Sequence, residues 1–172
     1  MTSAAGAARA GTIGGLAAGL IAIVPALLGS SGDGRIVGYA ALLAVLISVQ
    51  VGARAAALAP AGFAARLAAA ALIAVLASAL YGLALYLLYA ALRPQLLTLR
   101  YSAYAAALWT SGLSPERQAA GLAELAARRA QYLDPAYQAV EGAGLALFCG
   151  LVLGAYGAFR ARVAGRLGPR PG

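Results

Sequence analysis

Residues 67–92 constrain this chain more than any other stretch, because they form 26 consecutive positions without a charged side chain. The hydrocarbon core of a bilayer is about 30 Å thick, and about 20 helical residues cross it. The stretch contains no proline. A buried helix of a soluble protein would normally keep a charged face over this length. Residues 67–92 therefore predict a transmembrane helix.

The composition of the whole chain indicates that lipid is its solvent. Of the 172 residues, 63% are hydrophobic and only 10% are charged, whereas ordinary soluble domains are about 25% charged. No aqueous fold of this size could hide so much apolar surface. The net charge of +8 comes from arginines at the ends of apolar segments, where topology and anionic headgroups account for them. We therefore predict a lipid bilayer as the partner and no nucleic acid.

Four uncharged stretches reach spanning length, so the chain is predicted to be an all-α, polytopic membrane protein that forms a single membrane domain over residues 1–172. The predicted transmembrane helices cover about residues 10–29, 36–53, 67–92 and 142–160. The first could alternatively be a secretory signal peptide. Only the short turn 29–35 separates it from the second, which favours a pair of helices over a cleavage region.

Residues 94–134 differ from the spans and hold three of the five acidic residues. They predict an amphipathic helical hairpin between the third and fourth spans. The apolar stripe of its first helix recurs at helical spacing, at Leu97, Tyr101, Tyr104 and Leu108. The stripe of its second helix comprises Leu122, Leu125, Ala126 and Leu133. Ser114 and Asp134 each precede a proline, which is typical of the first residues of a helix.

The distribution of arginines predicts the orientation. The loop that contains Arg54 and Arg66 and the loose basic tail 161–172 carry no acidic residue, which is typical of cytoplasmic segments. Tyrosines and Trp109 gather at the opposite side, as an interfacial belt would. We therefore predict that both termini are cytoplasmic, that the insert 94–134 is extracytoplasmic, and that the tail meets anionic lipid headgroups.

Small residues recur every four positions in two of the spans. This spacing lets helix backbones approach closely in a membrane, and it is found at Gly11, Gly15, Gly19, Gly150 and Gly154. We interpret these glycines as helix-packing residues within one chain. The alternatives are a face for a second copy of the chain and the lining of a pore.

Three polar residues near the ends of the spans are candidate functional residues: Glu141, Arg54 and Gln50. Glu141 begins the fourth apolar stretch, where a carboxylate is either solvated and paired or serves as a proton or cation contact. Gln50 and Arg54 lie near the inner end of the second span. Arg54 is expected to reach toward the headgroups.

The sequence argues against catalysis. It contains no histidine and no lysine, which excludes a histidine-based triad, a Schiff base and a histidine metal site. We predict no catalytic, metal-binding or cofactor-binding residue and no cofactor. An enzyme that acts on lipids remains an alternative, and it would need four carboxylates to converge: Glu116, Glu124, Asp134 and Glu141.

Several local phrases occur in an order that resembles the DUF4199 family of small bacterial membrane proteins. They are Gly15–Gly19 in the first span, Gly52–Arg54, Gly62–Phe63, Ser111–Glu116, Leu133–Pro135 and Glu141. The resemblance covers about residues 12–162. It implies a four-span membrane protein of unknown function, lends weight to Arg54 and Glu141, and implies no reaction.

These features together predict an integral protein of the bacterial inner membrane that acts by interaction or assembly in the envelope. A membrane protein or a second copy of the chain would be its partner. The alternative is a small transporter or channel subunit, in which a water-filled path would reach Glu141 or Gln50.

Overall fold

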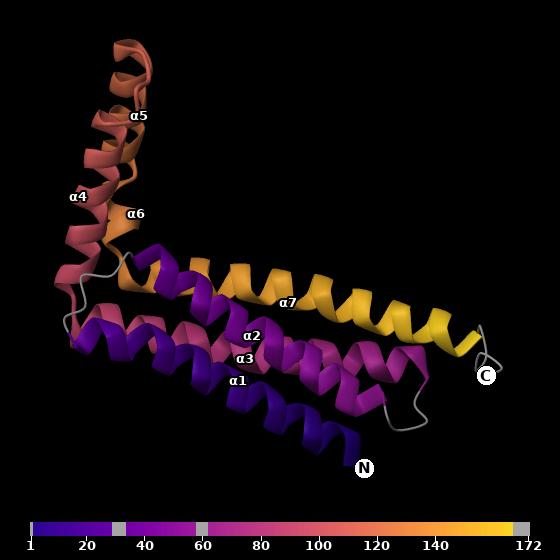
Figure 1. The fold of residues 1–172 in the computed structure, drawn as a ribbon. Coiled ribbons are helices and arrows are strands. Elements are labelled where there is room, and N and C mark those ends of the chain that lie inside the picture. The colour runs from indigo at the N-terminus through magenta and orange to yellow at the C-terminus, as the bar shows by residue number, and fades with distance from the viewer. Residues whose placement is uncertain (1, 29–33, 58–61, 167–172) are drawn as a thin grey trace.

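The computed structural model describes residues 2–28, 34–57 and 62–166, and every regular element in these ranges is a helix. Four long helices lie side by side and alternate in direction (Figure 1). They are α1 (Thr2–Leu27), α2 (Gly34–Ala57), α3 (Phe63–Leu87) and α7 (Pro135–Arg166). A single π-helical turn, η1 (Leu88–Leu92), extends α3. These helices form the bundle.

Three helices of the bundle are long and apolar enough to cross a membrane: Ala4–Leu27, Phe63–Leu92 and Pro135–Arg160. The prediction of an all-α chain is confirmed, and these three helices have the length and composition that membrane-spanning helices need. The first of these helices begins earlier than predicted, at Ala4 in place of residue 10. In α2 the apolar stretch Tyr39–Gly52 is shorter, so the fourth span stays a prediction.

The outer surface of the bundle is apolar on each helix. Exposed large apolar side chains include Leu16 and Leu20 on α1, Leu72 and Val75 on α3, and Phe148 and Val152 on α7. On α2 the exposed residues recur every four positions, at Tyr39, Leu43, Ile47 and Val51. Such a surface would be unstable in water and is matched by lipid tails.

Helix α3 lies at the centre of the bundle, where it packs against α1, α2 and α7. Its Ile73 is fully buried, and α2 contributes the fully buried Val45 and Val49. Most other core residues are alanines, among them Ala18, Ala41, Ala74 and Ala146. Lipid tails are as apolar as the core, so close packing of small residues is what holds such helices together.

Three further helices leave one end of the bundle and run crosswise to it (Figure 1). They are α4 (Gln95–Trp109), α5 (Pro115–Ala127) and α6 (Arg129–Leu133), and we call them the arm. The amino-terminal end of α1 and the carboxyl-terminal end of α7 lie at the opposite end of the bundle. The chain reverses at the arm's tip through Gly112, whose φ of +66° favours glycine.

Tyr101, Tyr104 and Leu108 of the first predicted stripe hold the arm together, but the residues that they meet, Tyr132 and Gly121, lie outside the stripe predicted for the second helix. The rings of Tyr101 and Tyr104 of α4 both meet the ring of Tyr132 of α6 at an angle, with ring centroids 6.4 Å and 5.8 Å apart and interplanar angles of 63° and 57°. Leu108 contacts Gly121 of α5. At the base, Leu97 is buried in the core of the bundle. The arm is therefore joined to the bundle at its base. Farther from the bundle, α4 packs against α5 and α6.

The two predicted helix starts differ in the structure. Asp134 caps α7, since its Oδ1 accepts a hydrogen bond of 2.9 Å from the backbone N–H of Ala136. Ser114 precedes Pro115 at the start of α5 but makes no side-chain cap hydrogen bond. The second predicted helix also breaks at Arg128, where α5 gives way to α6.

Candidate functional site

The glycines predicted on the first span lie against α3. A Cβ added to Gly11, Gly15 or Gly19 would come within 2.9, 2.7 and 2.8 Å of a neighbouring Cβ, respectively. The neighbours are Leu76, Leu80 and Ala84. At Gly15 the added atom would also lie 2.8 Å from the carbonyl oxygen of Ala77. Here the backbones of α1 and α3 approach too closely for any side chain.

The glycines of the last span also face helices of the same chain. A Cβ added to Gly150 would lie 3.0 Å from Ala74 Cβ, and one added to Gly154 would lie 2.8 Å from Ala70 Cβ. Both would contact Val49 of α2 at 3.5 Å. Within one chain, Gly150 and Gly154 therefore already pack against α3 and α2.

Sequence reasoning missed two close approaches between α3 and α7. A Cβ added to Gly82 would lie 2.8 Å from Ala143 Cβ, and one added to Gly142 would lie 2.6 Å from Leu85 Cδ1. Neither glycine has another glycine four residues away. The four-residue spacing that revealed the other glycines therefore gave no signal here.

Gln50 links two helices of the bundle. Its Nε2 donates a hydrogen bond of 3.1 Å to the backbone carbonyl of Leu153 on α7. The nearby Ser48 donates to the carbonyl of Val45 in its own helix, at 2.7 Å. The Gln50 amide thus contributes to the packing of α2 against α7. Arg54 lies one turn further along α2. The Arg54 side chain is outside the described residues.

Glu141 lies apart from Gln50. Its side chain is exposed on α7, twelve residues before Leu153, the acceptor of the Gln50 amide. Twelve helical residues correspond to roughly 18 Å along the axis. The structure therefore does not bring these two candidate residues to one place.

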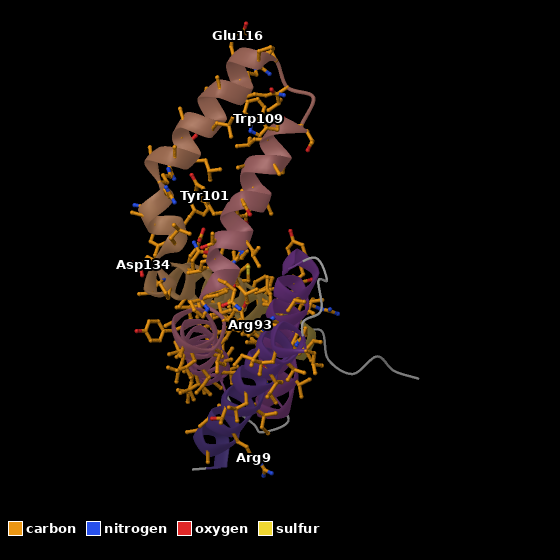
Figure 2. All side chains as sticks on the ribbon, turned by 90° about the vertical axis from the view of Figure 1, so that its left-hand side faces the viewer. Arg9, Arg93, Tyr101, Trp109, Glu116 and Asp134 are labelled. Carbon is orange, nitrogen blue, oxygen red and sulfur yellow. The ribbon has the colours of Figure 1, made fainter. Side chains whose placement is uncertain are left out.

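The four carboxylates that a lipid-acting enzyme would need do not converge. Glu116 lies at the tip of the arm and Asp134 at its base (Figure 2). Glu124 pairs with Arg128 at 3.0 Å on the exposed side of α5, and Asp134 is used as a helix cap. No group of three potential metal ligands occurs within the described part of the chain.

A polar cluster that the sequence did not reveal lies at the base of the arm. Arg100 Nη1 donates a hydrogen bond of 2.8 Å to the hydroxyl of Tyr89, and its Cζ lies 5.8 Å from the centroid of that ring. Partial burial lowers the pKa of the Arg100 guanidinium, but Tyr89 and Tyr104 raise it by more. The pKa of Arg100 is therefore raised above its ordinary value, and the group stays cationic.

The end of α3 places this cluster. In η1 the N–H of Arg93 donates to the carbonyl of Leu88 at 2.7 Å, which is the wider bonding of a π-helical turn. Pro94 has no N–H to continue the helix, and the residue before a proline is pushed out of the helical region. Arg93 accordingly has φ −146° and ψ 63°. The chain turns there into α4, which brings Arg100 back over Tyr89.

Two buried donors at this end of the bundle have no hydrogen-bond partner: Arg93 Nε and Gln138 Nε2. Gln138 is only 8% exposed, and it lies in the first turns of α7, which contact η1. An unsatisfied buried donor costs about 1–3 kcal/mol. We call Tyr89, Arg93, Arg100 and Gln138 the arm-base cluster.

No family model matches the chain, and neither the curated proteins nor the solved structures give a match. The resemblance to the DUF4199 family therefore stays a prediction.

Proposed function

We propose that this chain is an integral protein of the bacterial inner membrane that holds the arm at the membrane surface and acts through the contacts that the arm makes with an envelope partner. The observation that carries this proposal is the placement of the arm. It leaves the bundle at the end opposite to the start of α1 and the end of α7, and it runs crosswise to the bundle (Figure 1). An arm that crosses the helix axes would lie along the membrane plane.

The exposed surface of the arm supports a role in binding. On the α4 side, Leu99, Trp109 and Leu113 are exposed, with Trp109 at 65%. Trp109 follows Arg100 by nine residues, which is two and a half helical turns, so it projects from roughly the opposite side of α4. Since Arg100 faces the bundle through Tyr89, Trp109 faces away from it. Tryptophan is enriched among the residues that contribute most to binding at protein interfaces.

We further propose that α2 is a fourth span. Residues 36–53 are 18 uncharged positions, or roughly 27 Å of helix, which is close to the thickness of the hydrocarbon core. The exposed stripe of α2 is apolar over its described length, as on α1, α3 and α7. Its opposite side packs against α1, α3 and α7. A helix placed in this way would cross the bilayer with its neighbours.

The proposed orientation has both termini in the cytoplasm and the arm outside. At the end opposite to the arm the described residues include Arg9, Arg160 and Arg162, and no acidic residue lies near them in sequence. Arg162 lies over the ring of Phe63, 5.4 Å from its centroid. The positive-inside rule assigns such an end to the cytoplasm.

The packing of the bundle favours this role over that of a small transporter or channel subunit. A transport path would need polar groups that face a common passage. Gln50 is bonded to the backbone of α7, Glu141 is exposed on the outer surface, and the centre is filled by Ile73, Val45 and Val49.

Photo-crosslinking in intact membranes tests the proposal. A photoreactive amino acid at Trp109 should capture a discrete protein, whereas one at Leu43, on the exposed stripe of α2, should capture only lipid. Leu43 is the matched control because it is also apolar and exposed. If both positions captured nothing except lipid, the interaction role would be wrong. Flux through proteoliposomes that depended on Gln50 or Glu141 would support the transporter in its place.

A further inference from the structure

We propose that the arm-base cluster binds the phosphate group of an anionic phospholipid, with Arg93 and Arg100 as its principal ligands. This inference rests on the proposed function, because it requires the arm end of the bundle to lie at a membrane surface. It adds a binding site and the chemical class of its ligand.

The positive charge at the base of the arm is not compensated by the protein. Arg93, Arg100 and Arg129 have no carboxylate within 4.0 Å among the described residues. The nearby acids are used elsewhere, since Glu124 pairs with Arg128 and Asp134 caps α7. Arginines without carboxylate partners leave an anion as the complementary ligand.

Arg100 is held in place without losing its donors. The Tyr89 hydroxyl and ring fix the guanidinium through one hydrogen bond and one cation–π contact. A guanidinium has five N–H donors, so several remain for a phosphate. The Tyr89 hydroxyl accepts from Arg100 and keeps its own proton, which it can donate to the same oxygen. A side chain fixed in this way loses little conformational entropy when the ligand binds.

The two unpartnered donors require an acceptor. Arg93 Nε and Gln138 Nε2 are buried at the junction of η1 and α7 without a hydrogen bond. A phosphate oxygen can accept several hydrogen bonds at once, which suits a site built from donors alone.

The depth of the cluster favours a lipid as the source of the phosphate. The uncharged stretch of α3 ends at Leu92, directly before Arg93. The partly exposed Tyr86 and Tyr137 lie near the same level, as an interfacial tyrosine belt would. Arg93 lies where the arm meets the bundle in Figure 2. Headgroup phosphates occupy this depth, whereas a free phosphate would arrive from the aqueous side.

Titration of the detergent-purified full chain with phosphatidylglycerol, followed by native mass spectrometry, tests the site. We expect the wild type to bind phosphatidylglycerol more tightly than phosphatidylcholine. The double variant R93Q/R100Q should raise the apparent Kd for phosphatidylglycerol by about fivefold per arginine, or roughly 25-fold in total. R117Q, close to the tip of the arm, is the matched control and should leave the Kd unchanged.

A second set of measurements separates the two sources of phosphate and controls for misfolding. Calorimetric binding of inorganic phosphate that is lost in R93Q/R100Q, without any preference among lipids, would overturn the lipid as ligand. Equal affinities of the wild type and both variants would overturn the site. R100K keeps the charge but loses the planar fork, so an intermediate Kd with an unchanged circular dichroism spectrum supports the site. Extraction of the wild type from membranes by carbonate would instead contradict the proposed function.

Discussion

At the scale of single residues, the glycines set how closely the helices approach. The added Cβ at Gly15 would meet a backbone oxygen, which cannot move without moving α3, whereas flexible side chains can give way. Gln50 adds a hydrogen bond between α2 and α7, and such bonds in membranes contribute about 0.6 kcal/mol on average. Close backbone packing and this hydrogen bond thus both join the helices of the bundle.

Gly15→Leu should lower the free energy of unfolding by about 1–3 kcal/mol, because the new side chain forces α1 away from α3. Unfolding by sodium dodecyl sulfate in mixed micelles, followed by circular dichroism, measures the effect. The control is Gly144→Leu, since a Cβ at Gly144 meets nothing within 4 Å and that position is exposed. Equal losses in the two variants would show that close packing at Gly15 is not the cause.

At the same scale, the two predicted helix caps make a matched pair. Asp134→Ala removes the 2.9 Å bond to the N–H of Ala136 and should cost about 0.5–2 kcal/mol. Ser114→Ala removes no cap hydrogen bond and should be close to neutral. Thermal unfolding of both variants in the same detergent measures the difference. A larger loss in Ser114→Ala would contradict the assignment of the caps.

At the scale of elements, the arm depends on a tight reversal and on one layer of contacts between α4 and α5–α6. The reversal requires a residue in the left-handed conformation at Gly112. The contacts are those of the Tyr101 and Tyr104 rings with Tyr132 and the packing of Leu108 near Gly121. Apart from Leu125, few side chains of the arm are buried. The arm should therefore open more readily than the bundle.

Gly112→Ala should destabilise the arm by about 1–2 kcal/mol, since a Cβ is disfavoured at its φ of +66°. Hydrogen exchange should become faster in α4 and α5 and should stay unchanged in α3. Gly62→Ala is the control, because Gly62 has φ −64° and no atom within 4 Å of an added Cβ. Faster exchange throughout the bundle would mean that the arm is not a separate unit of stability.

At the scale of the whole molecule, the bundle and the arm have opposite relations to water. The bundle exposes an apolar surface along every one of its described helices, while α5 exposes charges such as Glu116 and Glu124. A molecule of this kind would have its bundle in lipid and its arm at the aqueous surface. The side of the membrane on which the arm lies then decides which partners can reach it.

Cysteine labelling of intact cells tests this arrangement on the background Cys149→Ser. A membrane-impermeant maleimide should label Glu116→Cys from outside, while Arg9→Cys should react only after lysis. The reason is that Glu116 lies at the tip of the arm and Arg9 belongs to the helix that starts at the other end of the bundle (Figure 2). The reverse pattern would place the arm in the cytoplasm.

The sequence by itself determined that this chain is helical and suited to a membrane, because uncharged length is a property of one segment and needs no partner. The stripe of Leu97, Tyr101, Tyr104 and Leu108 could likewise be read from spacing, and all of it except Leu97, which packs into the bundle, faces the rest of the arm. Both features depend on residues within a single helix.

Only the tertiary structure decided which surfaces meet. Gln50 and Leu153 are 103 residues apart, and Gly82 faces Ala143 without any periodic signal. Arg100 reaches Tyr89 because the chain turns at Arg93, and no spacing predicts the direction of that turn. Contacts of this kind depend on the relative rotation of helices, which is fixed by the sum of many small packing contributions and not by any one segment.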